Sequence, residues 1–430
     1  MGSLIVIGLG AVILFLALGI PIYLVLMGVA STLLVAEGRT VAGLGQHVLD
    51  HLQSPILISV PFFILAAVLM QGGGLARVLF NAALAWIGWV RGGLAMSGIA
   101  ATAVFAAITG SSAATTMAMG TLLVPMMVER GYKPSFAMGL TAAAGTLGIL
   151  IPPSLPMILF GLIAEESIPR LFLGGVIPGL MQAGLFALYV FFVADRVGGR
   201  AEPMVSRREF LSTNLHAFPA YMIPIVVLGG IYGGFVTLTE AAVLGVLCAL
   251  IAVLFVYRSA RLRDIPKMLT EAVDRTSVII LIIMGATLVS AWIIKSGVPQ
   301  DFARAIIESD LKPWQFLLIL NLCLLILGMF LEGVAIILIV LPVVSLVVRD
   351  MGIDMTHFAV VMVINIELAL LSPPIGLNLF VMSNVTGRPV SEVLRGTVPF
   401  FVIMLGLLMM VTFIPALSTW LPNLVLGQGG

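Results

Sequence analysis

The stretch from Gly145 to Ser154 constrains the fold more than any other, because it interrupts an uncharged region long enough to cross a lipid bilayer. That region runs from Ser135 to Ala164, and a helix needs about 20 apolar residues to span a bilayer. Pro152 and Pro153 lack a backbone N–H, and a proline also disfavours helical geometry in the residue before it. We therefore expect a broken helix that opens within this stretch and resumes around Pro156.

The composition places this broken helix in a membrane. Of the 430 residues, 61% are hydrophobic and only 10% are charged, whereas a soluble domain carries about 25% charged residues. An opened helix leaves backbone carbonyls unpaired, which hydrocarbon tolerates only inside protein or beside a water-filled cavity. We expect an all-α polytopic membrane protein in contact with membrane lipid, and the net charge of +1 gives no indication of nucleic-acid binding.

Two regions of 35 residues, 94–128 and 314–348, carry at most one charged residue each. Each is too long for one span of about 30 Å and too short for two comfortable spans. Small or polar residues lie at their centres: Gly110, Ser111 and Ser112 in the first, Glu332 and Gly333 in the second. We interpret both as re-entrant hairpins whose tips lie inside the membrane.

The order of elements repeats along the chain. The units are 1–196 and 214–421, joined by a polar linker at 197–213, and each contains a hairpin followed by a broken helix, at about 135–164 and 357–386. When the two proline pairs are aligned, Thr146 corresponds to Glu367 and Gly148 corresponds to Ala369.

Charge predicts that the two units are inverted in the membrane. Four arginines lie between 196 and 208, and five basic residues lie between 258 and 275. Both segments are expected on the cytoplasmic side, since cytoplasmic loops carry an excess of Lys and Arg. Equivalent loops in the other unit have the opposite bias, which predicts inverted-topology repeats with both termini on the periplasmic side.

Two hairpin tips and two broken helices from inverted units would meet near the middle of the bilayer, as in secondary transporters. Helix N-termini there attract anions, and unwound carbonyls coordinate cations. Close helix packing and a simple proline kink are the plain alternatives for the small residues and the prolines. The candidate substrate-binding residues are Gly110, Thr146, Pro153, Asn378 and Glu332.

Several motifs resemble the large membrane subunit of tripartite ATP-independent periplasmic (TRAP) transporters. They are the run from Gly110 to Thr115, the run from Gly145 to Ser154, the Gly-rich segment from Gly229 to Phe235, and Pro373 to Phe380. The resemblance covers almost the whole chain. Where the family usually has threonine before the second proline pair and glycine three residues earlier, this chain has Ser372 and Ala369.

The resemblance implies a Na⁺-coupled, elevator-type importer of a small organic anion in the bacterial inner membrane, with Na⁺ as coupling ion and no other cofactor. It implies two partner chains, a small four-helix membrane subunit and a soluble periplasmic substrate-binding protein. The matched motifs imply two cation sites. The first set is Ser111, Ser112, Gly145 and Gly148, and the second set is Gly333, Glu367, Ala369 and Ser372.

Other functions stay open at this point. A stand-alone carboxylate/cation symporter of related architecture would share these features, and a membrane channel could also use inverted re-entrant segments. Catalysis is not expected, because the sequence has neither a nucleophile–base pattern nor the ligand spacing of a zinc site.

Overall fold

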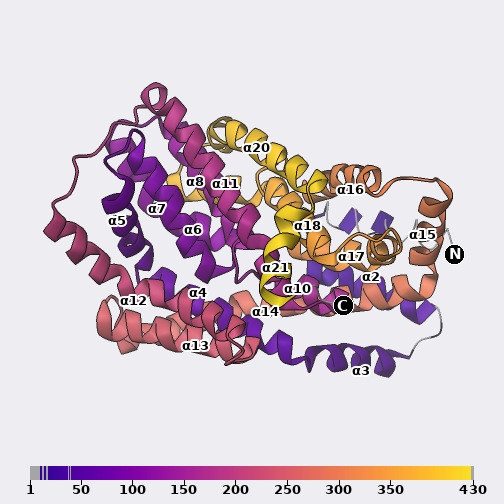
Figure 1. Cartoon of the computed structure of the whole chain (residues 1–430). Coiled ribbons are helices and arrows are strands. Elements are labelled where there is room, and N and C mark those ends of the chain that lie inside the picture. The colour runs from indigo at the N-terminus through magenta and orange to yellow at the C-terminus, as the bar shows by residue number, and fades with distance from the viewer. Residues whose placement is uncertain (1–9, 12–13, 16–17, 37, 39, 428–430) are drawn as a thin grey trace.

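The computed structural model describes residues 10–11, 14–15, 18–36, 38 and 40–427. Its described residues form helices and connecting turns without a β-strand, and eight helices are long and apolar enough to cross a membrane. The all-α polytopic prediction is therefore confirmed. Figure 1 shows an elongated bundle in which the first and second halves of the chain interleave.

The first half contains α2 to α11. They are α2 (Ile22–Ala36), α3 (Val41–Leu52), α4 (Pro55–Gly72), α5 (Leu75–Ile87), α6 (Gly93–Thr109), α7 (Ser112–Glu129), α8 (Pro134–Gly145), α9 (Leu147–Leu150), α10 (Leu155–Ala164) and α11 (Ile168–Val197). Helices α6 and α7 are two arms joined at Gly110 and Ser111. The region predicted as a broken helix is three pieces, α8, α9 and α10, and Ser154 begins the third as its N-cap.

The second half contains α12 to α21. They are α12 (Arg207–Tyr232), α13 (Leu238–Ile251), α14 (Ile265–Ser296), α15 (Val298–Glu308), α16 (Pro313–Gly328), α17 (Gly333–Asp350), α18 (Met355–Ala369), α19 (Leu377–Thr386), α20 (Val390–Phe413) and α21 (Ala416–Leu426). A π-helical turn covers Ala252–Val256 and a 3₁₀ turn covers Leu262–Asp264. Helices α16 and α17 are again two arms, and α18 and α19 are separated by an open segment.

The structure differs from the sequence-based boundaries in several places. The basic segment at 258–275 is not separate from the span after it, since α14 is continuous from Ile265 to Ser296. Its counterpart in the first half is divided because Pro55 starts α4, whereas α14 has no proline after Pro266. The linker is also shorter than 197–213, since Ser206 caps α12 and the helix begins at Arg207.

Two helix ends also differ. The apolar stretch that follows Val390 is divided, because α20 ends at Phe413 and α21 begins after Pro415. Thr237, and not Thr239, caps α13 in a capping box with Glu240. The Thr239 hydroxyl instead donates to the Pro55 carbonyl oxygen, 2.8 Å away.

The helices pack in two groups. The arms and broken helices pack on one another: α8 lies between α7 and α20, α17 packs on α10, and α16 packs on α18. At the crossing of α8 and α20 the backbones approach so closely that a Cβ on Gly139 would overlap Gly396. The other group consists of α2, α4, α13 and α14: α4 packs on α13, and α14 packs on α2 and α4. This group also contacts the arms, since α14 packs on α17 and α4 packs on α6.

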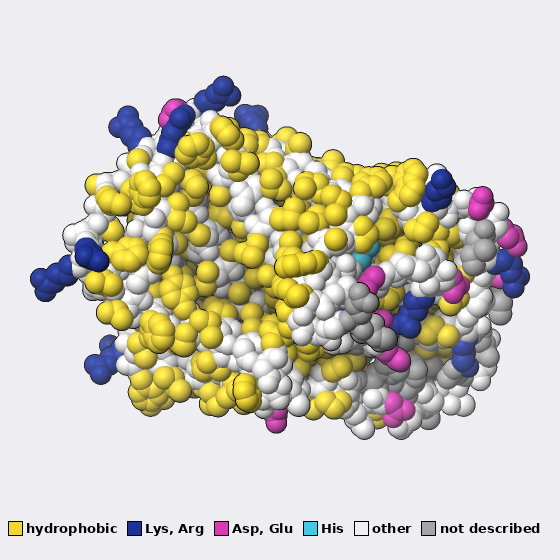
Figure 2. Space-filling view, in the orientation of Figure 1, with side chains coloured by type: hydrophobic (Ala, Val, Ile, Leu, Met, Phe, Trp, Pro, Cys, Tyr) yellow, Lys and Arg dark blue, Asp and Glu magenta, His cyan; other side chains and the backbone are white. Residues whose placement is uncertain are grey.

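Charged side chains gather at the two ends of the elongated molecule. Figure 2 shows a broad hydrophobic band between them, with Lys and Arg prevailing at the left end and acidic side chains mixed with basic ones at the right end. Such a band is what a bilayer requires of the surface it contacts.

Candidate functional site

The tip of the first hairpin packs directly against the first open segment. A Cβ on Gly148 would lie 2.8 Å from the Ser111 carbonyl oxygen and 2.8 Å from Thr115 Oγ1, and one on Gly145 would overlap the Thr116 side chain. Gly110 has a left-handed φ of +57°, and a Cβ there would lie 2.9 Å from the Pro153 carbonyl oxygen. The structure thus brings most of the first predicted cation set together, and only glycine permits this approach.

This contact is rich in uncharged oxygens. Ser111 caps α7, and its carbonyl oxygen accepts a hydrogen bond from the Thr115 hydroxyl at 2.8 Å. Thr116 Oγ1 is buried and has no hydrogen-bond partner among the residues that the structure describes. Hydroxyl and carbonyl oxygens of this kind are suitable ligands for a monovalent cation.

Asn378 joins the two halves of the chain. Its side-chain Nδ2 donates to Ser112 Oγ at 2.7 Å and to the Ala142 carbonyl oxygen at 3.0 Å. It is completely buried, and its Oδ1 has no hydrogen-bond partner in the described part of the chain. Asn378 therefore ties the second open segment to the first hairpin tip, a connection that the sequence did not predict.

A second buried polar cluster lies between the two broken helices. Gln182 of α11 donates through Nε2 to Thr146 Oγ1 at 2.9 Å, and the Thr146 hydroxyl donates to the Ala143 carbonyl oxygen. Glu367 is fully buried, and the polar side chains next to its carboxylate are those of Thr146 and Gln182. Neither oxygen makes a hydrogen bond of ordinary geometry with a described residue. The two residues that the repeat alignment paired, Thr146 and Glu367, therefore lie together.

The second tip packs against the end of α18. A Cβ on Gly333 would overlap Ile366, and one on Gly328 would overlap Ala369. Ser372 follows this contact, and its hydroxyl donates to the Leu368 carbonyl oxygen at 2.8 Å. The structure thus places Ala369 at the second tip. The Glu367 carboxylate lies elsewhere, because it faces Thr146 and Gln182.

A cavity of about 370 Å³ separates the first tip from the outer helices. It is lined by Gly110, Ser111 and Pro153, by Glu332 at the second tip, and by Arg275 of α14. The Arg275 guanidinium donates to Glu271 Oε1 at 2.6 Å and to Gln71 Oε1 at 3.3 Å. The volume is in the range of small-molecule pockets. The cavity brings the Arg275 cation next to the uncharged groups of the first tip and the Glu332 carboxyl of the second tip.

Helices α4, α10 and α14, which line the first cavity, also line a second cavity of about 360 Å³. Its lining includes Leu162 and Glu165 near the end of α10 and Ile283 and Lys295 on α14. The two cavities therefore follow one another along the boundary between the inner helices and the outer group.

Sequence reasoning missed three of these residues. Gln182 is one polar residue within a long apolar run, a signal that was available but was not used. Arg275 was counted only as a charge favouring the cytoplasmic side. Its place at the cavity became apparent once α14 proved continuous. Thr116 is one of several hydroxyl residues that follow the tip in the sequence, and its burial against Gly145 is a tertiary contact.

Paired hairpins and broken helices around buried polar groups, in a polytopic helical protein, define a membrane transporter of the secondary type. A family model described as "Tripartite ATP-independent periplasmic transporter, DctM component" matches residues 9–417. The chain belongs to this family, and it is a transporter component and not an enzyme.

Named relatives agree with this assignment. A C4-dicarboxylate TRAP transporter large permease protein of Pseudomonas aeruginosa is 41% identical over 395 residues, covering 92% of each chain. An isethionate TRAP transporter permease protein, DctMQ, of Oleidesulfovibrio alaskensis is 36% identical over 409 residues, covering 94% of this chain and 64% of the relative. Among solved structures, the YdaH transporter of Alcanivorax borkumensis has a TM-score of 0.59 at 13% identity, covering 87% of this chain and 90% of that one, which shows a shared fold.

Proposed function

We propose that this chain is the Na⁺-coupled membrane subunit of an importer of a small organic anion. The observation that carries the proposal is the cavity beside the first hairpin tip, which Arg275 lines together with Gly110, Ser111 and Pro153. A guanidinium is suited to a carboxylate or sulfonate, because it offers several donors in a fixed planar arrangement. The relatives are named for C4-dicarboxylates and isethionate, both of which are organic anions.

The coupling ion in this proposal is Na⁺, bound where Ser111, Thr116, Gly145 and Gly148 meet. Ser112 contributes through its bond to Asn378, so the site is connected to the second open segment. The second cation site lies at the second tip, among Gly333, Ala369 and Ser372. A cation that moves inward through the membrane potential gains about 2.3 kcal/mol per 100 mV.

The transport step in this proposal is an elevator movement of the inner helices against α2, α4, α13 and α14. Two features support it: the boundary between these groups contains both cavities, and the hairpin tips pack mainly on the broken helices. The proposed partners are a small membrane subunit and a periplasmic binding protein. The relative named DctMQ is longer than the part that this chain matches, since the match covers 64% of it.

Uptake by the full complex in liposomes tests the proposal. With an inward Na⁺ gradient we expect concentrative uptake that requires the binding protein, and Arg275→Gln should lower it at least tenfold. Arg263→Gln is the matched control, since Arg263 lies outside the cavity and its side chain is largely exposed. Uptake at the same rate with and without the Na⁺ gradient would rule out Na⁺ coupling. Rapid flux without the binding protein would favour a channel.

A further inference from the structure

The two hairpin tips bring different groups to the cavity beside the first tip. The first tip contributes Ser111 and the first turn of α7, and the second tip contributes Glu332. Arg275 of α14 lines the same cavity of about 370 Å³. A substrate in this cavity therefore meets a carboxylate as well as a cation, and the proposed function makes use of the cation alone.

The Glu332 carboxylate has no partner in the described part of the chain. Glu332 occupies the N-cap position of α17, but its side chain makes no capping hydrogen bond. It forms no ion pair with Arg275 or with any other described residue, and it is an exposed residue of the cavity lining. A carboxylate at membrane depth is costly, and such groups line substrate or ion pathways.

Arg275, by contrast, already has a carboxylate partner. Its guanidinium donates to Glu271 Oε1 at 2.6 Å, one turn earlier on α14. The unpaired charge of the cavity is therefore negative, although an arginine lines it. Both hydrogen bonds of Arg275 come from Nη2, which leaves Nε and Nη1 as donors for a substrate carboxylate.

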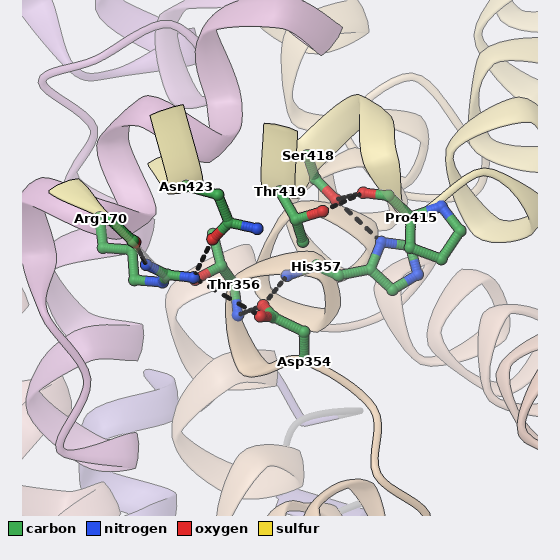
Figure 3. A network of polar contacts seen from close by, with 9 residues as sticks. Arg170, Asp354, Thr356, His357, Pro415, Ser418, Thr419 and Asn423 are labelled. Atoms are coloured by element: carbon green, nitrogen blue, oxygen red, sulfur yellow. Dashed lines mark hydrogen bonds and ion pairs between the residues drawn. The ribbon is translucent and has the colours of Figure 1, made fainter. Parts of the chain in front are cut away.

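A larger cavity, of about 620 Å³, shows the opposite arrangement of charge. Asp354 lines it, but this carboxylate accepts from the backbone N–H groups of Thr356 and His357 and lies 3.8 Å from Arg170. Figure 3 shows Asp354 held between Arg170 and the first turn of α18. The protein itself neutralises Asp354, whereas it leaves Glu332 for a ligand to neutralise.

We propose that the substrate is a zwitterion, an organic acid that also carries an ammonium or another cationic group. Its carboxylate binds at Arg275 and at the start of α7, where the positive end of the helix favours an anion. Its cationic group binds at Glu332, which would repel a second carboxylate. This inference rests on the proposed function, since it names the substrate class of the same site.

Equilibrium binding to the full membrane complex in nanodiscs, at saturating Na⁺, tests the inference. The probes are two pairs of acids with equal carbon chains, β-alanine with propionate and γ-aminobutyrate with butyrate. We expect each amino acid to bind roughly tenfold more tightly than its partner without the amino group. Glu332→Gln should remove this preference by weakening the amino acids, and unchanged binding of propionate and butyrate would show that the variant is folded.

Glu129→Gln is the matched control, because Glu129 is an exposed carboxylate at the opposite end of α7, and it should keep the preference. Equal binding within each pair would overturn the inference and leave the organic-anion function intact. Binding of all four acids that Arg275→Gln leaves unchanged would instead contradict the proposed function. If Glu332→Gln raised the Na⁺ requirement but kept the preference, Glu332 would serve the coupling ion, and the inference would be wrong.

Discussion

At the residue scale, the missing side chains of Gly145 and Gly148 decide the first candidate cation site. The hairpin tip reaches the open segment only because no Cβ stands between Gly148 and the Ser111 carbonyl oxygen. A hydroxyl-rich tip and an opened helix are separate features in the sequence. The two glycines allow them to form one set of oxygens.

Replacing Gly148 by alanine should disturb this contact. The added Cβ would lie 2.8 Å from a backbone oxygen, and overpacking of this kind costs about 1–3 kcal/mol. We expect a lower thermal midpoint and a higher Na⁺ concentration for half-maximal uptake. Gly184→Ala on α11 is the control, because nothing lies within 4 Å of a Cβ there. Equal effects of the two substitutions would contradict the assignment.

Glu166 gives a prediction for the dependence of stability on pH. Burial raises the pKa of this loop carboxyl above 4.5, and Arg349 only partly offsets the effect. The folded chain therefore holds the proton more tightly than the unfolded chain. This contribution is fully present below pH 4.5 and is lost as pH rises through the folded-state pKa. It should amount to less than about 1 kcal/mol, because the group is partly solvated.

Glu166→Gln should remove this contribution. The thermal midpoint of the variant, measured from pH 4 to pH 8, should fall less with rising pH than that of the unmodified protein. Glu165→Gln, at an exposed neighbouring position, serves as control. A steeper fall in the Glu166 variant would show that the pairing with Arg349 prevails over burial.

At the element scale, buried side-chain hydrogen bonds hold the two open segments in place. Asn378 at the start of α19 bonds to the first residue of α7 and to α8, while Gln182 of α11 reaches the first open segment at Thr146. Both donors are buried. Polar contacts in a dry interior make the relative position of the broken helices specific.

Asn378→Leu should therefore separate these elements. The substitution leaves Ser112 Oγ and the Ala142 carbonyl oxygen without their donor, at a cost of about 1–3 kcal/mol. We expect a lower thermal midpoint together with weaker Na⁺ activation of uptake. Asn384→Leu, on the exposed side of the same helix, should leave both unchanged. A fall in stability without any change in Na⁺ activation would mean that Asn378 serves only packing.

At the scale of the whole molecule, the distribution of charge defines two ends (Figure 2). The segment around Arg200 lies between α11 and α12, and the segment around Ser167 lies at the other end of α11. Because α11 has 30 residues and mean hydropathy typical of a span, these two segments must lie on opposite sides of the membrane.

Single cysteines at Arg200 and Ser167 test the predicted orientation. After Cys248 and Cys323 are replaced, a membrane-impermeant thiol reagent added to intact cells should label the cysteine at position 167 and not the one at position 200. The positive-inside rule predicts this result. Labelling at position 200 alone would reverse the predicted orientation and place both termini in the cytoplasm.

The sequence by itself determined the class of structure and the places where its helices open. Apolar runs leave an α-helical bundle as the stable structure in hydrocarbon. The proline pairs end α9 and α18, because proline has no N–H and cannot continue a helix. These effects are local, so residues near one another in the sequence were enough to predict them. The family model likewise matches the sequence itself, over residues 9–417.

Only the tertiary structure decided which polar groups meet. Arg275 lines a cavity with Ser111 and Pro153 because α14 continues without a break past the hairpin tip. Glu367 lies with Gln182, and Ser112 with Asn378, because helices far apart in the sequence cross there. Burial and hydrogen bonding between distant residues depend on packing in three dimensions, which helical periodicity and local motifs do not encode.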